Sequence, residues 1–110
     1  MHHLTGEMRE CVDNCVRCHE SCLGMLMTHC LEAGGKHLAP EHVKIMMACA
    51  TICQTAADFM IMNSSHHPHV CRECAEICRE CAKSCEDVGD MQDCVDACRR
   101  CAESCGRMAA

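Results

Sequence analysis

The chain has 110 residues, enough for one domain with a single core, and a formal net charge of −6 at pH 7. This acidic balance argues against nucleic acid as a partner, and the lack of a run of about 18 apolar residues argues against a membrane span. Cysteine fills 16 positions, as many as leucine, isoleucine, valine and phenylalanine together. Because free cysteine behaves as a small hydrophobic residue, the sequence predicts a core built largely of sulfur.

The first residues of the chain bear on the expected cellular location. No basic segment followed by an apolar stretch opens the sequence, so we expect no secretory signal and a cytoplasmic location. Cysteines stay reduced there, which favours metal binding over a disulfide framework.

Cysteines recur at steps of 3 and 4, the spacing that places residues on one face of an α-helix. The first predicted helix spans residues 6–33, between a cap at Thr5 and the pair Gly34–Gly35. Its stripe consists of Met8, Cys11, Cys15, Cys18, Cys22, Met25 and His29. The second helix, residues 40–63, opens at Pro40, a residue suited to the first helical turn. Its stripe consists of His42, Met46, Cys49, Cys53, Ala56 and Met60.

The third helix spans residues 68–88, and its stripe consists of Cys71, Cys74, Cys78, Cys81 and Cys85. The fourth helix spans residues 91–107 with Asp90 as its cap, and its stripe consists of Met91, Cys94, Cys98, Cys101, Cys105 and Met108. The segments 11–22 and 94–105 share nine of twelve residues, and 74–85 repeats their cysteine spacing. The repeated segment therefore forms a helix face lined with cysteine, and its copies allow several helices to direct sulfur atoms at one another.

Short connections between long helices favour antiparallel neighbours. We therefore predict an all-α fold, an antiparallel up-down-up-down four-helix bundle with a cysteine-lined core, as one domain over residues 1–110. Cys53 should lie level with Cys78, while Cys30 falls off the stripe. A second apolar stripe on the first two helices predicts a contact with another subunit, and the alternative is that it only widens the core-facing stripe. Its residues are Val12, Val16, Leu23, Leu26, Ile45, Ala48, Ile52, Phe59 and Met62.

Several kinds of chemistry could use this sulfur. A purely structural core would lose stability by choosing cysteine over leucine, and cysteines i and i+4 on one helix lie too far apart for a disulfide. The loop spacing of bacterial ferredoxins is absent. Four-thiolate zinc sites would leave about −2 of charge each inside the bundle, whereas each Cu(I) replaces one proton and leaves the core neutral. Cu(I) also prefers thiolate and thioether ligands, so the charge argument selects copper.

The ends of the stripes carry neutral donors. One end should gather Met25, His29, His42 and Met46, with Met91 nearby, and we take it as the entrance for copper. The other end should gather Met8, Met60, His67 and Met108, flanked by His66 and His69. The remaining histidines, His2, His3, His19 and His37, we expect on the solvated surface.

With these cysteine stripes the sequence resembles the bacterial copper storage proteins, in particular their cytosolic branch. The resemblance rests on seven CxxxC pairs: Cys11/Cys15, Cys18/Cys22, Cys49/Cys53, Cys74/Cys78, Cys81/Cys85, Cys94/Cys98 and Cys101/Cys105. It implies a homotetramer of bundles, each holding many Cu(I) ions along its axis, with His and Met ligands near one mouth.

We therefore expect a non-enzymatic store of about 14–18 Cu(I) ions per chain, which a copper chaperone or efflux partner could serve. The expected metal ligands are the fifteen stripe cysteines, from Cys11 to Cys105 without Cys30, together with Met25, His29, His42, Met46 and Met60. The alternatives are a thiol-based redox or zinc buffer and a metal-responsive interaction module.

Overall fold

The structure, a computed structural model, describes residue 4 and residues 6–109. Four long helices run antiparallel to one another: α1 (Gly6–Met25), α3 (Pro40–Ile61), α4 (His67–Val88) and α5 (Gln92–Met108). Three short elements join α1 to α3: the π-helix η1 (Leu26–Cys30), one turn of α-helix α2 (Leu31–Ala33) and the 3-10 helix η2 (Gly35–Leu38). The expected cap Thr5 and the expected surface residues His2 and His3 lie outside the described residues.

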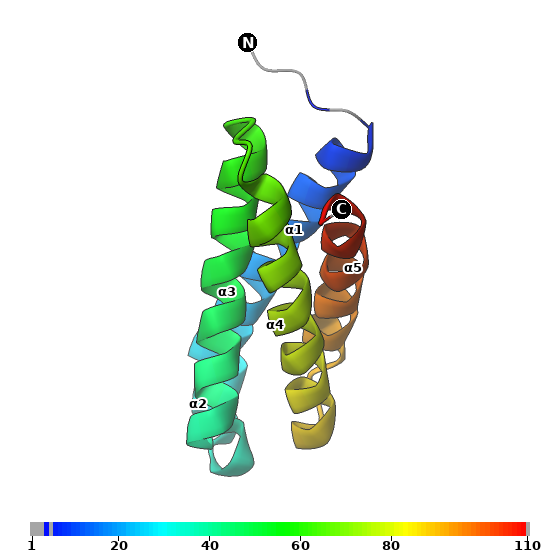
Figure 1. The fold of residues 1–110 in the computed structure, drawn as a ribbon. Coiled ribbons are helices and arrows are strands. Elements are labelled where there is room, and N and C mark those ends of the chain that lie inside the picture. Colours follow the sequence, from blue (N-terminus) through cyan, green and yellow to red (C-terminus); the bar gives the residue numbers. More distant parts are fainter. Residues whose placement is uncertain (1–3, 5, 110) are drawn as a thin grey trace.

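Each long helix packs against two neighbours, so the four surround one axis. Helix α1 lies beside α3 and α5, and α4 lies on the other side of the axis against the same two helices (Figure 1). The described residues form a body of 44 × 23 × 18 Å, whose long dimension follows the helices. The predicted four-helix bundle with its cysteine-lined core is confirmed.

The helices begin and end where backbone chemistry requires it. Pro40 and Pro68 stand in the first turns of α3 and α4, where a missing N–H costs no hydrogen bond. Gly34 and Gly89 follow the helices with φ of 64° and 87°, a conformation that glycine adopts without a steric penalty. The expected cap Asp90 is wrong: Met91 is the residue before α5, and Asp90 itself has a φ of 55° in the turn.

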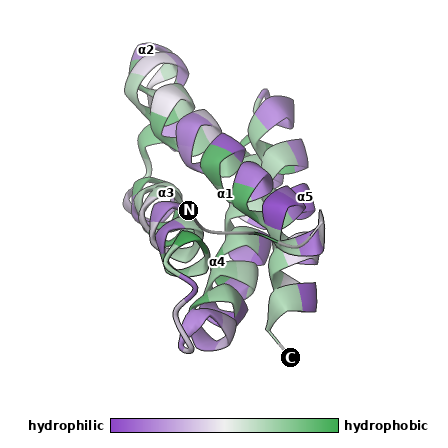
Figure 2. Cartoon of the chain, turned by 90° about the horizontal axis from the view of Figure 1, so that it is seen from above, coloured by the Kyte–Doolittle hydropathy of each residue, from purple (hydrophilic) through white to green (hydrophobic). Residues whose placement is uncertain are grey.

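Polar side chains cover the outside of the bundle and cysteines fill the inside. Viewed along the axis, each helix alternates between hydrophobic and hydrophilic residues around its circumference (Figure 2). Helix α3 is the most apolar, and by length and composition alone it would suffice to cross a membrane. Its buried stripe, which includes Cys49 and Cys53, packs into the core, as in the central helix of many soluble proteins.

Candidate metal centre

All sixteen cysteines are reduced and buried, each with none of its surface exposed to solvent. Fifteen of them are the stripe residues that the sequence predicted. The prediction was possible because the 3–4 spacing of the cysteines is unbroken in α4 and α5. Four helices each point one stripe at the axis, so their sulfurs meet in a continuous column. The sixteenth is Cys30, which the sequence placed off the stripe. That expectation is wrong, since Cys30 is as buried as the others.

Sulfur atoms from different helices touch throughout the column. Cys53 on α3 illustrates this: its Sγ lies 3.6 Å from Cys78 Sγ, 3.8 Å from Cys74 Sγ and 3.7 Å from Cys101 Sγ. The predicted level of Cys53 with Cys78 is confirmed. A disulfide bond measures about 2.05 Å, so these sulfurs are in van der Waals contact and not bonded. The column therefore presents closely spaced thiols that an inserted metal ion can join.

The sulfurs form groups that could each hold a metal ion. Four groups of four and one of three have all their sulfurs within 4.8 Å of one another: Cys15, Cys74, Cys101, Cys105; Cys18, Cys49, Cys53, Cys78; Cys18, Cys22, Cys49, Cys98; Cys53, Cys74, Cys78, Cys101; and Cys11, Cys71, Cys105. Neighbouring groups share cysteines, so no more than two of the four-cysteine groups can be filled at once without sharing a ligand. Complete filling of the column thus requires thiolates that bridge two ions.

The core has no charge to balance thiolates. Among the described residues, the buried polar side chains are His37, His42 and Ser104, and no Lys, Arg, Asp or Glu is buried. Contact with Cys101, together with burial, raises the pKa of the Cys53 thiol. With no buried cation among the described residues to balance a thiolate, burial favours the protonated thiols, and metal ions must replace those protons.

One end of the column lies where η1 and η2 meet the first turn of α3 and the α4–α5 turn. Here His42, Met46 and Met91 are buried, while Met25 and His29 are half-buried beside them. Burial lowers the pKa of the His42 imidazole, which favours its neutral, metal-binding form. The prediction that Met and His residues gather at this end agrees with their positions in the structure.

Two residues of this end were missed by the sequence prediction. Helix α1 was expected to continue as an α-helix, but η1 is a π-helix whose wider turn shifts the following residues by about one position. As a result Leu26 and Cys30, and not Met25 and His29, follow Cys22 into the core. Cys22, Leu26 and Cys30 follow one another at steps of four residues, and this spacing is the signal in the sequence that could have revealed the wider turn.

His37 was expected on the surface, and this is wrong. It lies in η2 and is only 8% exposed, with Nδ1 3.8 Å from the Cys30 Sγ. His19, also expected on the surface, is half-buried, and its Nδ1 lies 2.8 Å from the Ala50 carbonyl oxygen. Short connections such as η2 carry no periodicity, so the sequence did not show which way His37 faces.

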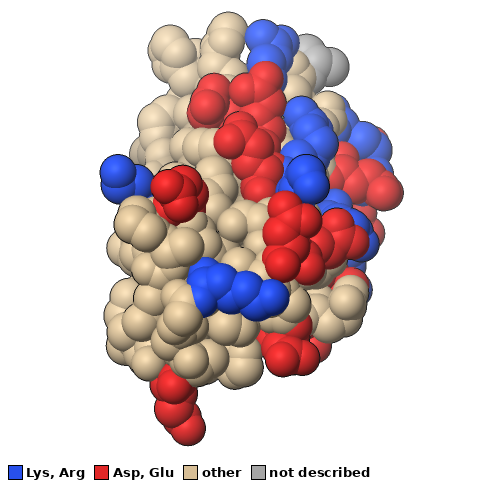
Figure 3. Space-filling view, turned by 90° about the horizontal axis from the view of Figure 1, so that it is seen from below, with Lys and Arg blue, Asp and Glu red and all other residues tan. Residues whose placement is uncertain are grey.

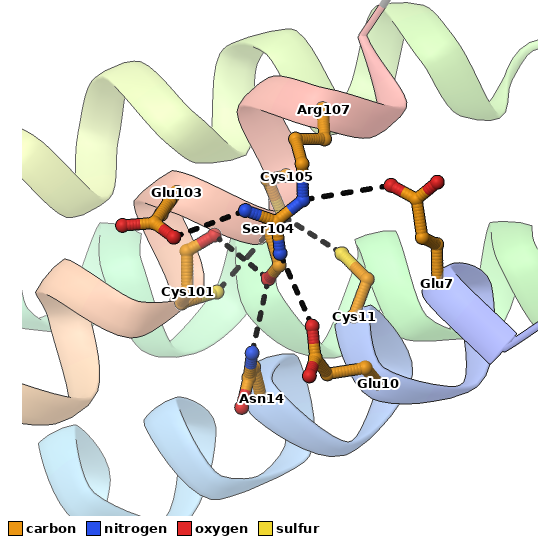
Figure 4. Close-up of polar contacts among 9 residues, drawn as sticks. All are labelled: Glu7, Glu10, Cys11, Asn14, Cys101, Glu103, Ser104, Cys105 and Arg107. Carbon is orange, nitrogen blue, oxygen red and sulfur yellow. Dashed lines mark hydrogen bonds and ion pairs between the residues drawn. The ribbon is translucent and has the colours of Figure 1, made fainter.

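Near the opposite end an exposed ion-pair network joins α1 to α5 (Figure 4). Arg107 on α5 contacts Glu10 on α1 at 3.1 Å and Glu103 at 3.0 Å, and also reaches Glu7. Beneath it Asn14 Nδ2 donates to Ser104 Oγ at 3.2 Å. These contacts tie the start of α1 to the end of α5.

The expected donors of that end lie at different depths. Met60 is fully buried, and Met8 and Met108 pack partly buried against the core. His67 is half-buried, with Nδ1 3.0 Å from the Ser64 carbonyl oxygen, and the His66 and His69 rings lie exposed, 6.4 Å apart. The first end is therefore the one where imidazoles approach a core sulfur.

Comparison with known proteins finds the same architecture elsewhere. A protein from Nitrosospira multiformis, Nmul_A1745, has a crystal structure that matches with 52% identity over 94% of both chains and a TM-score of 0.92. The Cu(I)-bound copper storage protein BsCsp3 matches with 32% identity, a TM-score of 0.87, and coverage of 94% of this chain and 99% of its own. Metal-free Csp3 from Bacillus subtilis matches with 34% identity, a TM-score of 0.82, and coverage of 93% and 98%.

A curated relative adds sequence similarity alone. The cysteine-rich protein YhjQ of Bacillus subtilis is 34% identical over 67 residues, and the match spans 61% of this chain and 61% of that protein. The family model described as copper storage protein matches residues 4–110. With the bundle, the sulfur column and these matches in agreement, the chain belongs to the copper storage protein family.

Proposed function

We propose that this protein stores copper by binding multiple Cu(I) ions through cysteine thiolates inside the bundle. The observation that carries the proposal is the column of buried thiols, with overlapping four-sulfur groups and no buried counter-charge in the described part of the chain. Cu(I) accepts two or three soft ligands and replaces one proton per ion, so bridging thiolates can fill the column without building up charge. The Cu(I)-bound state of the related BsCsp3 supports this choice of metal.

The ligands that we propose are the fifteen stripe cysteines from Cys11 to Cys105, with Met25, His29, His42, Met46 and Met60 toward the ends. Met and neutral His bind Cu(I) without losing a proton, which suits sites of uptake and release. The half-buried Met25 and His29 would serve at the mouth, and the fully buried Met46 and Met60 within the column.

Proton release tests this mechanism. When Cu(I) displaces thiol protons, loading in a weakly buffered anaerobic solution should release about one proton for each thiolate engaged. The same experiment with Zn²⁺ should saturate at no more than two ions in unshared four-cysteine groups. Loading with Cu(I) without proton release would exclude thiolate ligation.

We further propose that copies of the chain assemble into a homotetramer through the side formed by α1 and α3. Figure 3 shows that charged side chains gather on the side of α5, whereas the side of α3 is largely uncharged. Large apolar residues are exposed on η1, α2, η2 and α3 and directly after α3: Met27, Leu31, Leu38, Met47, Ile61 and Met62. Val12 and Leu26, which the sequence placed on this contact stripe, are instead buried in the core of the chain itself.

We also propose that the protein acts in the cytoplasm as a store without catalytic activity, where a copper chaperone or an efflux partner would exchange copper with it. The family match supports the storage role. The mixed donors at the first end of the column are the groups that such a partner would meet.

A further inference from the structure

One group of sulfurs in the column has three members, whereas the other four groups have four. It consists of Cys11 on α1, Cys71 on α4 and Cys105 on α5, whose sulfurs all lie within 4.8 Å of one another. These are the first cysteines of α1 and α4 and the last cysteine of α5. The sulfurs of Cys11 and Cys105 lie 3.6 Å apart (Figure 4), and all three residues are without exposed surface. The group is therefore a buried triangle of thiols contributed by three different helices.

Helix α3 supplies no thiol at this level of the bundle. The sulfurs of Cys53 on α3 and Cys74 on α4 lie 3.8 Å apart, and the two helices are antiparallel. Three residues further along α3 is Ala56, which is therefore level with Cys71, three residues before Cys74. Ala56 is fully buried and carries only a methyl group. The fourth side of the triangle thus faces a small apolar residue, where a fourth sulfur stands in the other groups.

Charge decides which kind of ion suits three thiolates in this core. Among the described residues no Lys or Arg is buried that could balance three negative charges. A single Cu(I) ion held by these thiolates alone would leave two negative charges, and a divalent ion would leave one. Uncompensated buried charge is costly. A trivalent ion alone makes an isolated group of three thiolates neutral.

Trivalent arsenic meets this requirement and forms three bonds to sulfur. Arsenous acid, As(OH)3, is uncharged at neutral pH, so it reaches a buried site without the cost of moving an ion out of water. In each of three steps an As–O bond breaks, an As–S bond forms, and the thiol proton leaves with the hydroxide as water. The oxidation states of arsenic and sulfur do not change. No proton is released to the solution, and the core is neutral before and after binding.

The geometry of the product fits the triangle. Arsenic bonded to three sulfurs is pyramidal, and its lone pair points away from the sulfurs. In a four-cysteine group the fourth sulfur would crowd the side on which the lone pair lies. In the three-cysteine group that side is the one left open by the small Ala56.

We propose that the thiols of Cys11, Cys71 and Cys105 form a binding site for trivalent arsenic, taken up as arsenous acid. The site uses three of the thiols proposed for copper, so arsenic and Cu(I) compete for them. It requires no bound copper.

Addition of one equivalent of arsenite to the metal-free, reduced chain at neutral pH, without oxygen, tests the proposal. Native mass spectrometry should show a gain of one arsenic atom and a loss of three hydrogen atoms. Arsenic X-ray absorption should show three sulfur neighbours and no oxygen neighbour. Binding in a weakly buffered solution should release no protons, whereas Cu(I) loading should release them. Failure to bind arsenic, or arsenic that keeps an oxygen neighbour, would overturn the proposal.

Variants locate the arsenic. Cys71→Ser removes one of the three thiols and should weaken binding of the first arsenic at least about tenfold, since even loss of a group that only supports a ligand has an effect of this size. Cys81→Ser is the matched control, because Cys81 is an equally buried thiol of α4 that belongs to none of the five groups. It should bind arsenic like the unaltered chain, and both variants should keep the helical circular dichroism. Equal binding by Cys71→Ser and the unaltered chain would overturn the site.

Counting Cu(I) on the same preparations separates this inference from the storage function. A chain that fills with Cu(I) but does not bind arsenic would refute the arsenic site alone. A chain that binds one arsenic but few Cu(I) ions would support the arsenic site and refute the storage function.

Discussion

At the scale of single residues, cysteine is both the apolar filling and the ligand. Cys53 and Cys101 lie 3.7 Å apart in the centre of the column, where other proteins would place leucine. The protonated thiols need no counter-ion, and the same atoms become ligands once Cu(I) takes the place of the protons. The same side chains thus fill the core when they are protonated and bind Cu(I) when they are deprotonated.

This protonation makes the stability of the metal-free protein depend on pH in both directions. Burial favours the protonated form of the core thiols and raises the pKa of Cys30, so this contribution to stability is lost as the pH rises above the unfolded-state value of about 8.5. Burial lowers the pKa of His42, so its contribution is lost as the pH falls below about 6.5. Urea unfolding midpoints of the metal-free, reduced protein should therefore be highest between these values. A midpoint that keeps rising above pH 9 would contradict a core of protonated thiols.

Ala56 on α3 provides a second test with a single residue. It is fully buried on the stripe of α3, where the other helices carry cysteine. Ala56→Cys should raise the Cu(I) capacity by about one ion, because the new thiol joins the bridged column. Metal analysis after removal of loosely bound copper measures the change. Ala56→Ser, which adds a similar volume without sulfur, should leave the capacity unchanged; an increase in both variants would refute the explanation.

At the scale of elements, the regular helices could be predicted and the π-turn could not. Steps of 3 and 4 run unbroken through α4 and α5, so Cys78 or Cys98 could face only the axis. In η1 the assumption of an α-helical turn carried the stripe to His29, one residue before the buried Cys30. The wider turn is stable because it buries Cys30 against its partners, and such tertiary contacts are invisible to a periodicity. For the same reason His37, in a four-residue connection, was misplaced.

Removing one residue from η1 tests the role of this turn. Thr28 is exposed, and its hydroxyl donates to the Gly24 carbonyl oxygen at 2.8 Å. Deletion of Thr28 should restore a regular α-helix and rotate Cys30 out of the core. Alkylation of the native, reduced protein followed by peptide mass spectrometry should then find Cys30 modified, whereas it is protected in the unaltered chain. Thr28→Ala keeps the length and should leave Cys30 protected; equal protection in the deletion variant would show that the π-turn does not set its position.

At the scale of the whole molecule, charge divides the surface into two sides. Charged side chains lie over α5, where Arg107 pairs with Glu10 of α1, while exposed apolar residues follow η1 to α3. A net charge of −6 on the chain would keep copies apart unless the uncharged side is where they meet. The proposed tetramer accounts for this division.

Substitutions on the uncharged side should therefore break the assembly. Met47 and Met62 are 39% and 62% exposed on and just after α3, and a charge buried there in an interface would be costly. Met47→Glu with Met62→Glu should convert the tetramer to smaller species in light scattering, with the helical content unchanged. Arg79→Glu, exposed on α4, is the control. A chain that is already monomeric, or a double variant with the unaltered mass, would refute this interface.

The central claim concerns the column as a whole, and the most direct test counts its ions. The fully reduced protein is titrated anaerobically with Cu(I) against a competing chelator, and tightly bound copper is counted per chain. Bridging thiolates predict about 14 or more ions, close to one for each cysteine, and a higher unfolding temperature of the loaded protein. A count near two would show isolated four-cysteine sites without bridging and would contradict a column that fills with copper.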